Sequence, residues 1–242
     1  MKGKIARTMS SPIVTFPILI LAFASGAARP QQPAAPASYP NMAPLEQYLM
    51  PDRSAEIALA RSAAPRAISD DAEVMVLTRQ GYETAAKGTN GFLCIVERGW
   101  TAPEDDPNFW NPKLRGPICF NAAAVRSYLP HTFMKTQLIL AGKSKAEMFR
   151  AIESALDKKE LPSPERDAMC YMLSKQQYLD DKAGHWHPHV MFFVPLAAAA
   201  AWGANLDGSP VMAADAPQDR MSIFMIPVPR WSDGTLDESP MN

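Results

Sequence analysis

Proline content is the strongest restriction on how this chain can fold, because proline interrupts helix interiors and the hydrogen-bond ladders of central strands. The sequence contains 23 prolines in 242 residues, nearly twice the ordinary usage of about 5%. They recur along most of the chain. The sequence therefore predicts short helices and strands that are joined by long connections.

Composition and charge narrow the class of protein. Hydrophobic residues make up 47% of the chain and charged residues 20%, which is typical of a globular protein. Lys and Arg total 24, and Asp and Glu total 25. This balance gives no indication of a nucleic acid or an anionic membrane as a partner, and the sequence assigns no other partner.

The first 28 residues have the three parts of a secretory signal peptide. A basic start, an apolar run and a group of small residues follow one another, and these are Lys2, Lys4 and Arg7, residues 13–24, and residues 25–28. The apolar run is shorter than the span of about 20 residues that crosses a bilayer. We expect cleavage near residues 24–28 and export to the periplasm or the extracellular space, with no transmembrane segment in the mature chain. The alternative is an uncleaved N-terminal anchor.

The next segment, residues 29–44, contains five prolines and is expected to be an extended linker. Residues 45–242 then form a single predicted globular domain. Strands are expected at 74–77, 82–86 and 92–96, and we expect these three to form an antiparallel meander. Further short strands are expected near 118–120, 169–173, 190–194 and 221–228.

Helices are expected between the two groups of strands. Asn121 is a plausible N-cap for a helix that Pro130 interrupts. Ser144 and Glu147 have the spacing of a capping box, which begins the clearest helix of the chain. The order of strands, helices and strands predicts an α+β fold, with an antiparallel sheet, helices packed on one face and long Pro-rich connections.

Three cysteines are present, and export to an oxidising compartment permits a disulfide. Cys94 and Cys119 each lie in a short apolar run, and their spacing suits a bridge between neighbouring strands. We therefore predict a disulfide between these two. Cys170 is left as a free cysteine, which is usually a small buried apolar residue.

Chemically versatile side chains are concentrated at His185, His187 and His189, which are three of the four histidines in the chain. In an extended strand these residues would share one face, with successive rings about 6.5–7 Å apart. Two of them could bind one Zn or Cu ion if a remote residue completed the site, and His131, Asp180 and Asp181 are the candidates by type. Pro188 weakens this prediction, because a proline indicates an edge or the start of a strand, where histidines need no special role.

Two classes of function remain. The first is an exported, soluble, non-catalytic protein that binds a ligand or a partner. The aromatic loop from Trp100 to Trp110 could supply contacts for it, although buried tryptophans are the commoner case. The second is a Zn- or Cu-dependent enzyme of hydrolase type that uses the histidines at 185, 187 and 189. The sequence does not decide between them and identifies no cofactor.

Overall fold

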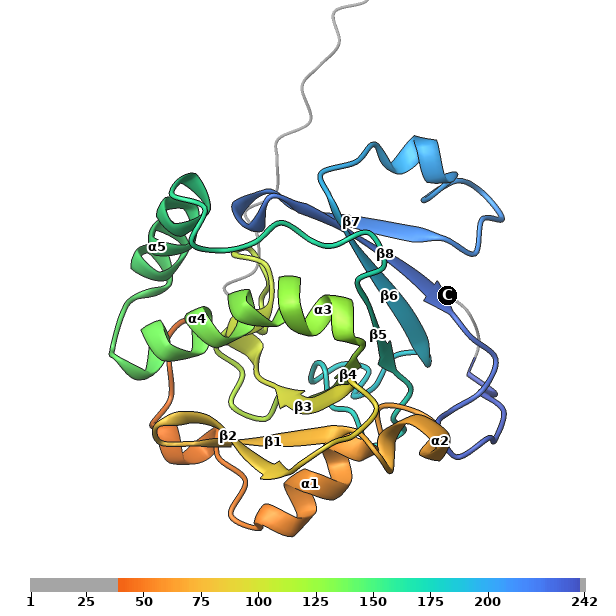
Figure 1. Ribbon diagram of the computed structural model, residues 1–242, viewed down its shortest axis with the longest axis horizontal. Coiled ribbons are helices and arrows are strands. Elements are labelled where there is room, and N and C mark those ends of the chain that lie inside the picture. Colours follow the sequence, from red (N-terminus) through yellow and green to blue (C-terminus); the bar gives the residue numbers. More distant parts are fainter. Residues whose placement is uncertain (1–38, 240–242) are drawn as a thin grey trace, which may run out of the picture. The chain divides into compact units, whose positions relative to one another are not determined.

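A computed structural model describes residues 39–239, so the expected signal peptide and most of the linker lie outside the described residues. One mixed sheet of eight strands extends through this part of the chain, in the order β2-β1-β3-β4-β5-β6-β8-β7 (Figure 1). The strands are β1 (Glu73–Thr78), β2 (Gly81–Ala86), β3 (Leu93–Glu97), β4 (Gly116–Phe120), β5 (Met169–Met172), β6 (His189–Pro195), β7 (Met212–Ala216) and β8 (Met221–Pro227).

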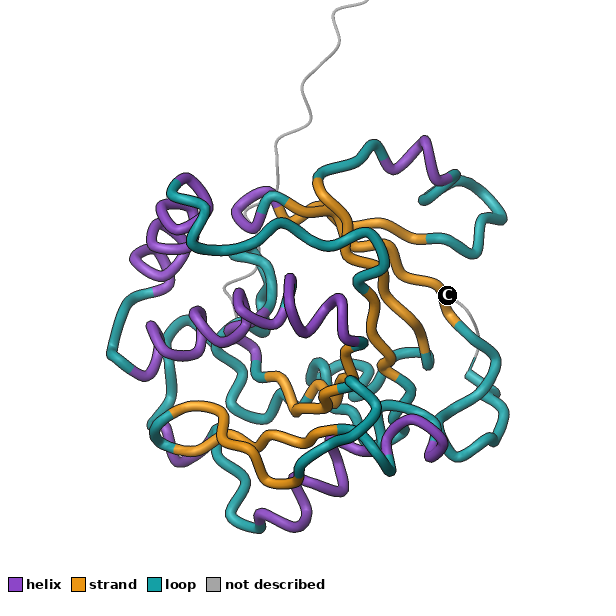
Figure 2. The backbone as a smooth tube through the Cα atoms, in the orientation of Figure 1, coloured by secondary structure: helices purple, strands orange, loops and turns teal. Residues whose placement is uncertain are grey.

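The helices are short, and those of residues 122–157 follow one another closely, whereas long loops connect several of the strands, as Figure 2 shows. The helix that begins after Asn121 ends at Ser127, and Pro130 lies in the first turn of the next helix, a position where proline loses no intrahelical hydrogen bond. No helix within residues 39–239 is long and apolar enough to cross a membrane. The helices are α1 (Arg53–Arg61), α2 (Arg66–Ser69), α3 (Ala122–Ser127), α4 (Leu129–Leu140) and α5 (Lys145–Asp157), with single 3-10 turns η1 (Leu45–Gln47), η2 (Gly99–Thr101), η3 (Ala199–Trp202) and η4 (Pro217–Asp219).

Side-chain caps fix the starts of α3 and α5 as the sequence predicts. The Asn121 side chain accepts a hydrogen bond from the backbone nitrogen of Ala124 at the start of α3. Ser144 and Glu147 form the predicted capping box at the start of α5. Each cap satisfies a backbone N–H that has no partner inside the helix.

The α+β class is confirmed, and every neighbouring strand pair is antiparallel except β1 with β3. That parallel pair corrects the expected meander, because β1 rather than β2 lies beside β3. The strand β1 is the more apolar of the two, and its Val74 and Val76 side chains are buried. The more polar β2 takes the edge, where one side of its backbone needs no partner strand.

Helices cover both faces of the sheet around β3 and β4, whereas the sequence placed them on one face. Along β3, Leu93 and Ile95 join the cluster that includes residues of α3 and α4. Cys94 and Val96 join the cluster on the opposite face, which includes α1. Figure 1 shows α1 on the opposite side of β3 from α3 and α4. All five β3 residues are buried as a result.

The predicted disulfide joins Cys94 to Cys119. These residues lie directly opposite each other in the antiparallel register of β3 and β4. Both are fully buried beneath α1. Cys170 is free and buried in β5, in the cluster on the other face.

Removing the disulfide with Cys94→Ala and Cys119→Ala together is expected to lower the free energy of unfolding by about 3 kcal/mol. The crosslink closes a loop of 25 residues, and that closure restricts the unfolded chain. Urea unfolding followed by tryptophan fluorescence measures the loss. The matched control is Cys170→Ala, which removes a buried cysteine that forms no disulfide. Equal stability of the double variant and the wild type, or three free thiols in the denatured wild type, would contradict the disulfide.

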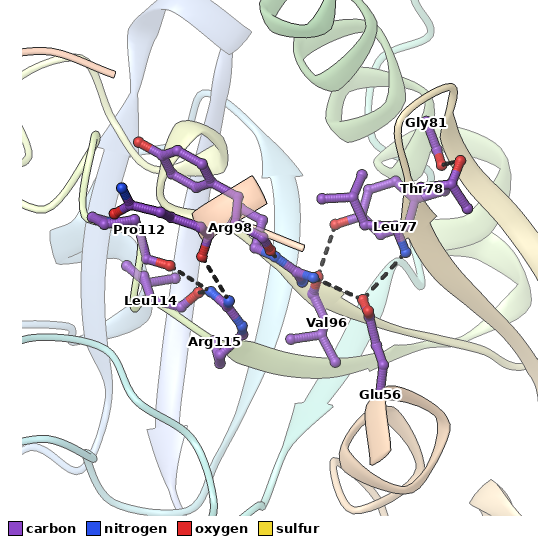
Figure 3. A network of polar contacts seen from close by, with 12 residues as sticks. Glu56, Leu77, Thr78, Gly81, Val96, Arg98, Pro112, Leu114 and Arg115 are labelled. Carbon is purple, nitrogen blue, oxygen red and sulfur yellow. Dashed lines mark hydrogen bonds and ion pairs between the residues drawn. The ribbon is translucent and has the colours of Figure 1, made fainter. Parts of the chain in front are cut away.

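Arg98, directly after β3, connects four separate segments of the backbone (Figure 3). Its side chain is fully buried, and its Nη2 forms an ion pair of 2.8 Å with Glu56 Oε1 on α1. Its Nε donates to the Tyr48 carbonyl at 2.7 Å, and its Nη1 donates to the Val96 carbonyl. Glu56 Oε1 also accepts the backbone N–H of Leu77 in β1. The buried charges are therefore paired and hydrogen-bonded.

Glu56→Gln is expected to lower the free energy of unfolding by about 3–5 kcal/mol, because Arg98 keeps a buried charge without its counter-ion. Thermal and urea unfolding measure the change. Asp70→Asn is the control, since the Arg66–Asp70 pair is exposed and such pairs contribute about 1 kcal/mol or less. A loss as small for Glu56→Gln as for the control would show that the buried pair does not hold these segments together.

Candidate functional site

The histidine stretch does not have the strand geometry on which the metal prediction depended. Strand β6 begins only at His189, so His185 and His187 lie in the loop before it. Pro188 has no N–H to donate, but its carbonyl accepts the N–H of Val228. The three rings enter three different environments.

His185 is exposed, and its ring meets the ring of Trp231 edge-on with centroids 5.6 Å apart. His187 is largely buried, and its Nδ1 lies 2.5 Å from Asp237 Oδ2. Burial alone would raise the pKa of Asp237, but hydrogen bonds from His187 and from the Ser239 backbone hold that pKa below its ordinary value. Asp237 is therefore ionised at neutral pH, and it orients the imidazole of His187 as a carboxylate partner does.

His189 is buried at the start of β6, with only 3% of its surface exposed. Its Nδ1 lies 2.8 Å from the carbonyl of His187, so this nitrogen carries the proton. The ring also meets Trp186 edge-on at 4.6 Å. Burial lowers the pKa of His189 to about 4, which keeps the ring neutral at physiological pH.

Convergence on a metal ion is not observed. Within residues 39–239, no group of three or more His, Cys, Asp or Glu side chains is arranged to hold a metal. The remote candidates are engaged elsewhere. His131 Nδ1 contacts Asp219, and Asp180 accepts the N–H groups of residues 182 and 183. Asp181 accepts from Lys113 and from two tyrosine hydroxyls. The described residues thus lend the metal prediction no support.

Two cavities lie on either side of the C-terminal segment that carries Asp237. The first has a volume of about 620 Å³ and the second about 310 Å³, within or near the range of small-molecule sites. Asp237 and Ser239 line both cavities. The other lining residues of the first are Lys175, His185, Trp231, Thr235, Leu236 and Glu238. Those of the second are His187, Pro210, Pro227, Val228 and Pro229.

Gln177 lies beside the histidine stretch and has an unusual hydrogen-bonding state. Its Nε2 donates to the Trp186 carbonyl at 2.5 Å, which fixes the orientation of its amide. Its Oε1 is the one buried side-chain polar atom without a partner in the part of the chain that the structure describes. Such an acceptor is satisfied by a water or a ligand donor in most proteins.

The C-terminal tail after β8 is folded back against the domain by backbone hydrogen bonds. Trp231 is buried, and its N–H donates to the Thr235 carbonyl across a tight turn. The N–H of Asp237 donates to the Pro229 carbonyl, which folds the tail back on itself. A sequence signal was present, because Asp233-Gly234 is a typical two-residue turn. Figure 1 shows this loop beyond β8.

The aromatic loop after β3 does not form a contact surface. Trp100, Phe109 and Trp110 are buried in one cluster with residues of α4 and α5. The Trp100 indole N–H donates to Thr136 on α4 at 3.1 Å. Tyr39 and Met42, from the segment predicted as linker, pack against the same cluster.

A second group of buried polar side chains lies beneath α4. Lys135 forms a 2.7 Å ion pair with Asp219, and His131 contacts the same carboxylate at 3.3 Å. Burial raises the pKa of the nearby Glu97 to about 7, although a hydrogen bond from Thr132 opposes the shift. These residues line neither of the two cavities, so this group holds α4 to η4 rather than facing a ligand.

Comparison with known proteins adds no further assignment. No protein-family model matches the chain, and neither does any curated protein or any solved structure. The candidate site therefore rests on the geometry of His187, Asp237 and the two cavities.

His189 is expected to make the protein sensitive to acid. Its folded pKa of about 4 lies below the ordinary 6.5, so its stabilising effect is present above pH 6.5 and is lost as the pH falls towards 4. The wild type should lose about 3 kcal/mol more than His189→Phe between pH 7 and pH 4, at about 1.36 kcal/mol per pKa unit. Urea unfolding at both pH values measures this, with His185→Phe as the exposed control. Parallel losses in the wild type and His189→Phe would exclude the effect.

Proposed function

We propose that this is an exported protein that binds a small organic molecule between the C-terminal tail and the histidine stretch. The observation that carries the proposal is the His187–Asp237 pair at the boundary of two adjoining cavities. The second cavity is mostly apolar with a few fixed polar groups, which is the usual form of a small-molecule site.

Export is supported by two independent features. The N-terminal pattern of basic, apolar and small residues is typical of a signal peptide. The Cys94–Cys119 disulfide fits a protein that reaches an oxidising compartment. The periplasm and the extracellular space both meet this condition.

The polar groups at the site are pre-organised for binding. Asp237 holds the imidazole of His187 in one orientation, and Ser239 holds Asp237 by a backbone hydrogen bond of 3.1 Å. Within residues 39–239, His187 Nε2 has no protein partner and is not fully buried. It is therefore accessible to a ligand. A rigid acceptor beside an apolar wall gives orientation and specificity to a ligand.

The alternative of a Zn- or Cu-dependent hydrolase has weaker support. Metal-binding histidines often donate the N–H of their second ring nitrogen to a carboxylate, and His187 Nδ1 faces Asp237 in this way. The other ligands that such a site requires are not arranged around His187 in the described residues. Binding without metal catalysis is therefore the function that we put forward.

Protein recovered from the exported fraction is expected to bind small organic probes at this site. The tests are the mass of the recovered chain and ¹H–¹⁵N NMR with benzyl alcohol, benzylamine and benzoate. The recovered chain should be shortened near residues 24–28. It should contain less than about a tenth of an equivalent of Zn or Cu. The probes should shift the NMR signals of Trp231 and residues 235–239. Trp231→Phe identifies the indole signal, and the buried Trp100 is the internal control. An intact Met1 on a membrane-bound protein would overturn export, and absence of shifts with all three probes would overturn the binding site.

A further inference from the structure

The second cavity offers almost no hydrogen-bond donor from the backbone. Three of its seven lining residues are Pro210, Pro227 and Pro229, which have no N–H. The N–H of Val228 is donated to the Pro188 carbonyl, and that of Asp237 to the Pro229 carbonyl. The N–H of Ser239 is donated to Asp237 Oδ1. Of the seven residues, only His187 has a backbone N–H that is not accounted for in this way.

Acceptors and negative charge remain in the same cavity. His187 Nδ1 faces Asp237, which leaves its Nε2 on the other side of the ring without a protein partner. Asp237 contributes a carboxylate, and no Lys or Arg lines this cavity. Lys175 lines the other cavity, where it pairs with Asp233 at 3.0 Å. A ligand of the second cavity therefore has to supply the donor, and a positive charge on it would be favoured.

The lining of the second cavity indicates the non-polar part and the size of its ligand. Prolines and Val228 present aliphatic surface, which favours a hydrocarbon group. The volume of about 310 Å³ is at the lower end for ligand sites, so the molecule is small.

We infer that the second cavity binds a small organic amine, with the ammonium group at the His187–Asp237 pair and the hydrocarbon body against the three prolines. This inference rests on the proposed function, because it names the ligand class of the same site. An ammonium donates the hydrogen bond that the wall lacks, and the Asp237 carboxylate compensates its charge. A carboxylate ligand would meet the negative charge of Asp237, and no Lys or Arg lines the cavity to offset that repulsion.

Matched probes test the charge and the donor without changing the protein. Cyclohexylamine, cyclohexanol and cyclohexanecarboxylate share one hydrocarbon ring and differ in the polar group. Titration at pH 7.5, followed by the ¹H–¹⁵N signals of His187, Val228 and Asp237, gives each dissociation constant. We expect the amine to bind about tenfold or more tightly than the carboxylate, with the alcohol between them.

Protein variants then locate the acceptor. His187→Phe keeps a ring of similar size but removes Nε2. The affinity for the amine should therefore fall about tenfold, so that the amine and the alcohol bind with more nearly equal affinity. Tyr178→Phe is the control, because it removes only a hydroxyl and Tyr178 lines neither cavity, and it should leave the affinity for the amine unchanged. Unfolding curves of both variants show whether each is folded.

The outcomes separate this inference from the proposed function. If the carboxylate binds these residues as tightly as the amine, or if His187→Phe stays folded and binds the amine like the wild type, the inference fails while a binding site remains. If none of the three cyclohexyl probes shifts the signals of the second cavity, the inference also fails. If the benzyl probes also leave the first cavity unperturbed, the proposed function fails with it.

Discussion

The buried ion pair between Arg98 and Glu56 is the interaction on which the N-terminal half of the domain depends. A guanidinium inside a protein has to find acceptors for its N–H groups and a counter-charge, or its burial costs several kcal/mol. Arg98 meets this requirement with Glu56 on α1 and with the carbonyls of Tyr48 and Val96. The position of α1 over the sheet is thereby tied to β1, β3 and the chain before α1. The Cys94–Cys119 disulfide lies beneath the same helix and fixes the register of β3 and β4.

The C-terminal half is organised differently, because its candidate site forms where a loop and the chain terminus meet at one end of the sheet. The tail after β8 folds back through backbone hydrogen bonds and is held to the histidine stretch by Asp237 and His187. Prolines around the second cavity remove backbone donors from its wall. The high proline content, which first indicated only short elements, thus also determines the hydrogen-bonding character of the site.

Local signals in the sequence predicted local structure well. The caps at Asn121 and Ser144, the apolar runs that became β3 and β4, and the pairing of Cys94 with Cys119 all follow from neighbouring residues or simple spacing. Predictions that required knowledge of distant neighbours were less successful. The partner of β3 was missed because a strand sequence does not show which of two other strands will lie beside it. The sequence left both exposure and burial of Trp100 and Trp110 open, because a proline-rich loop has no periodicity to indicate its buried side.

The sequence by itself determined the α+β class, the short elements and the disulfide. It did so because caps, turns, alternation and cysteine spacing act over a few residues or between adjacent strands. Only the tertiary structure decided what each histidine does. His189 and His187 differ by two positions, yet one is buried against Trp186 and the other pairs with Asp237, which is 50 residues away. Burial and charge pairing are set by atoms that come together only when the chain folds, and they decide the protonation and the exposed nitrogen of an imidazole.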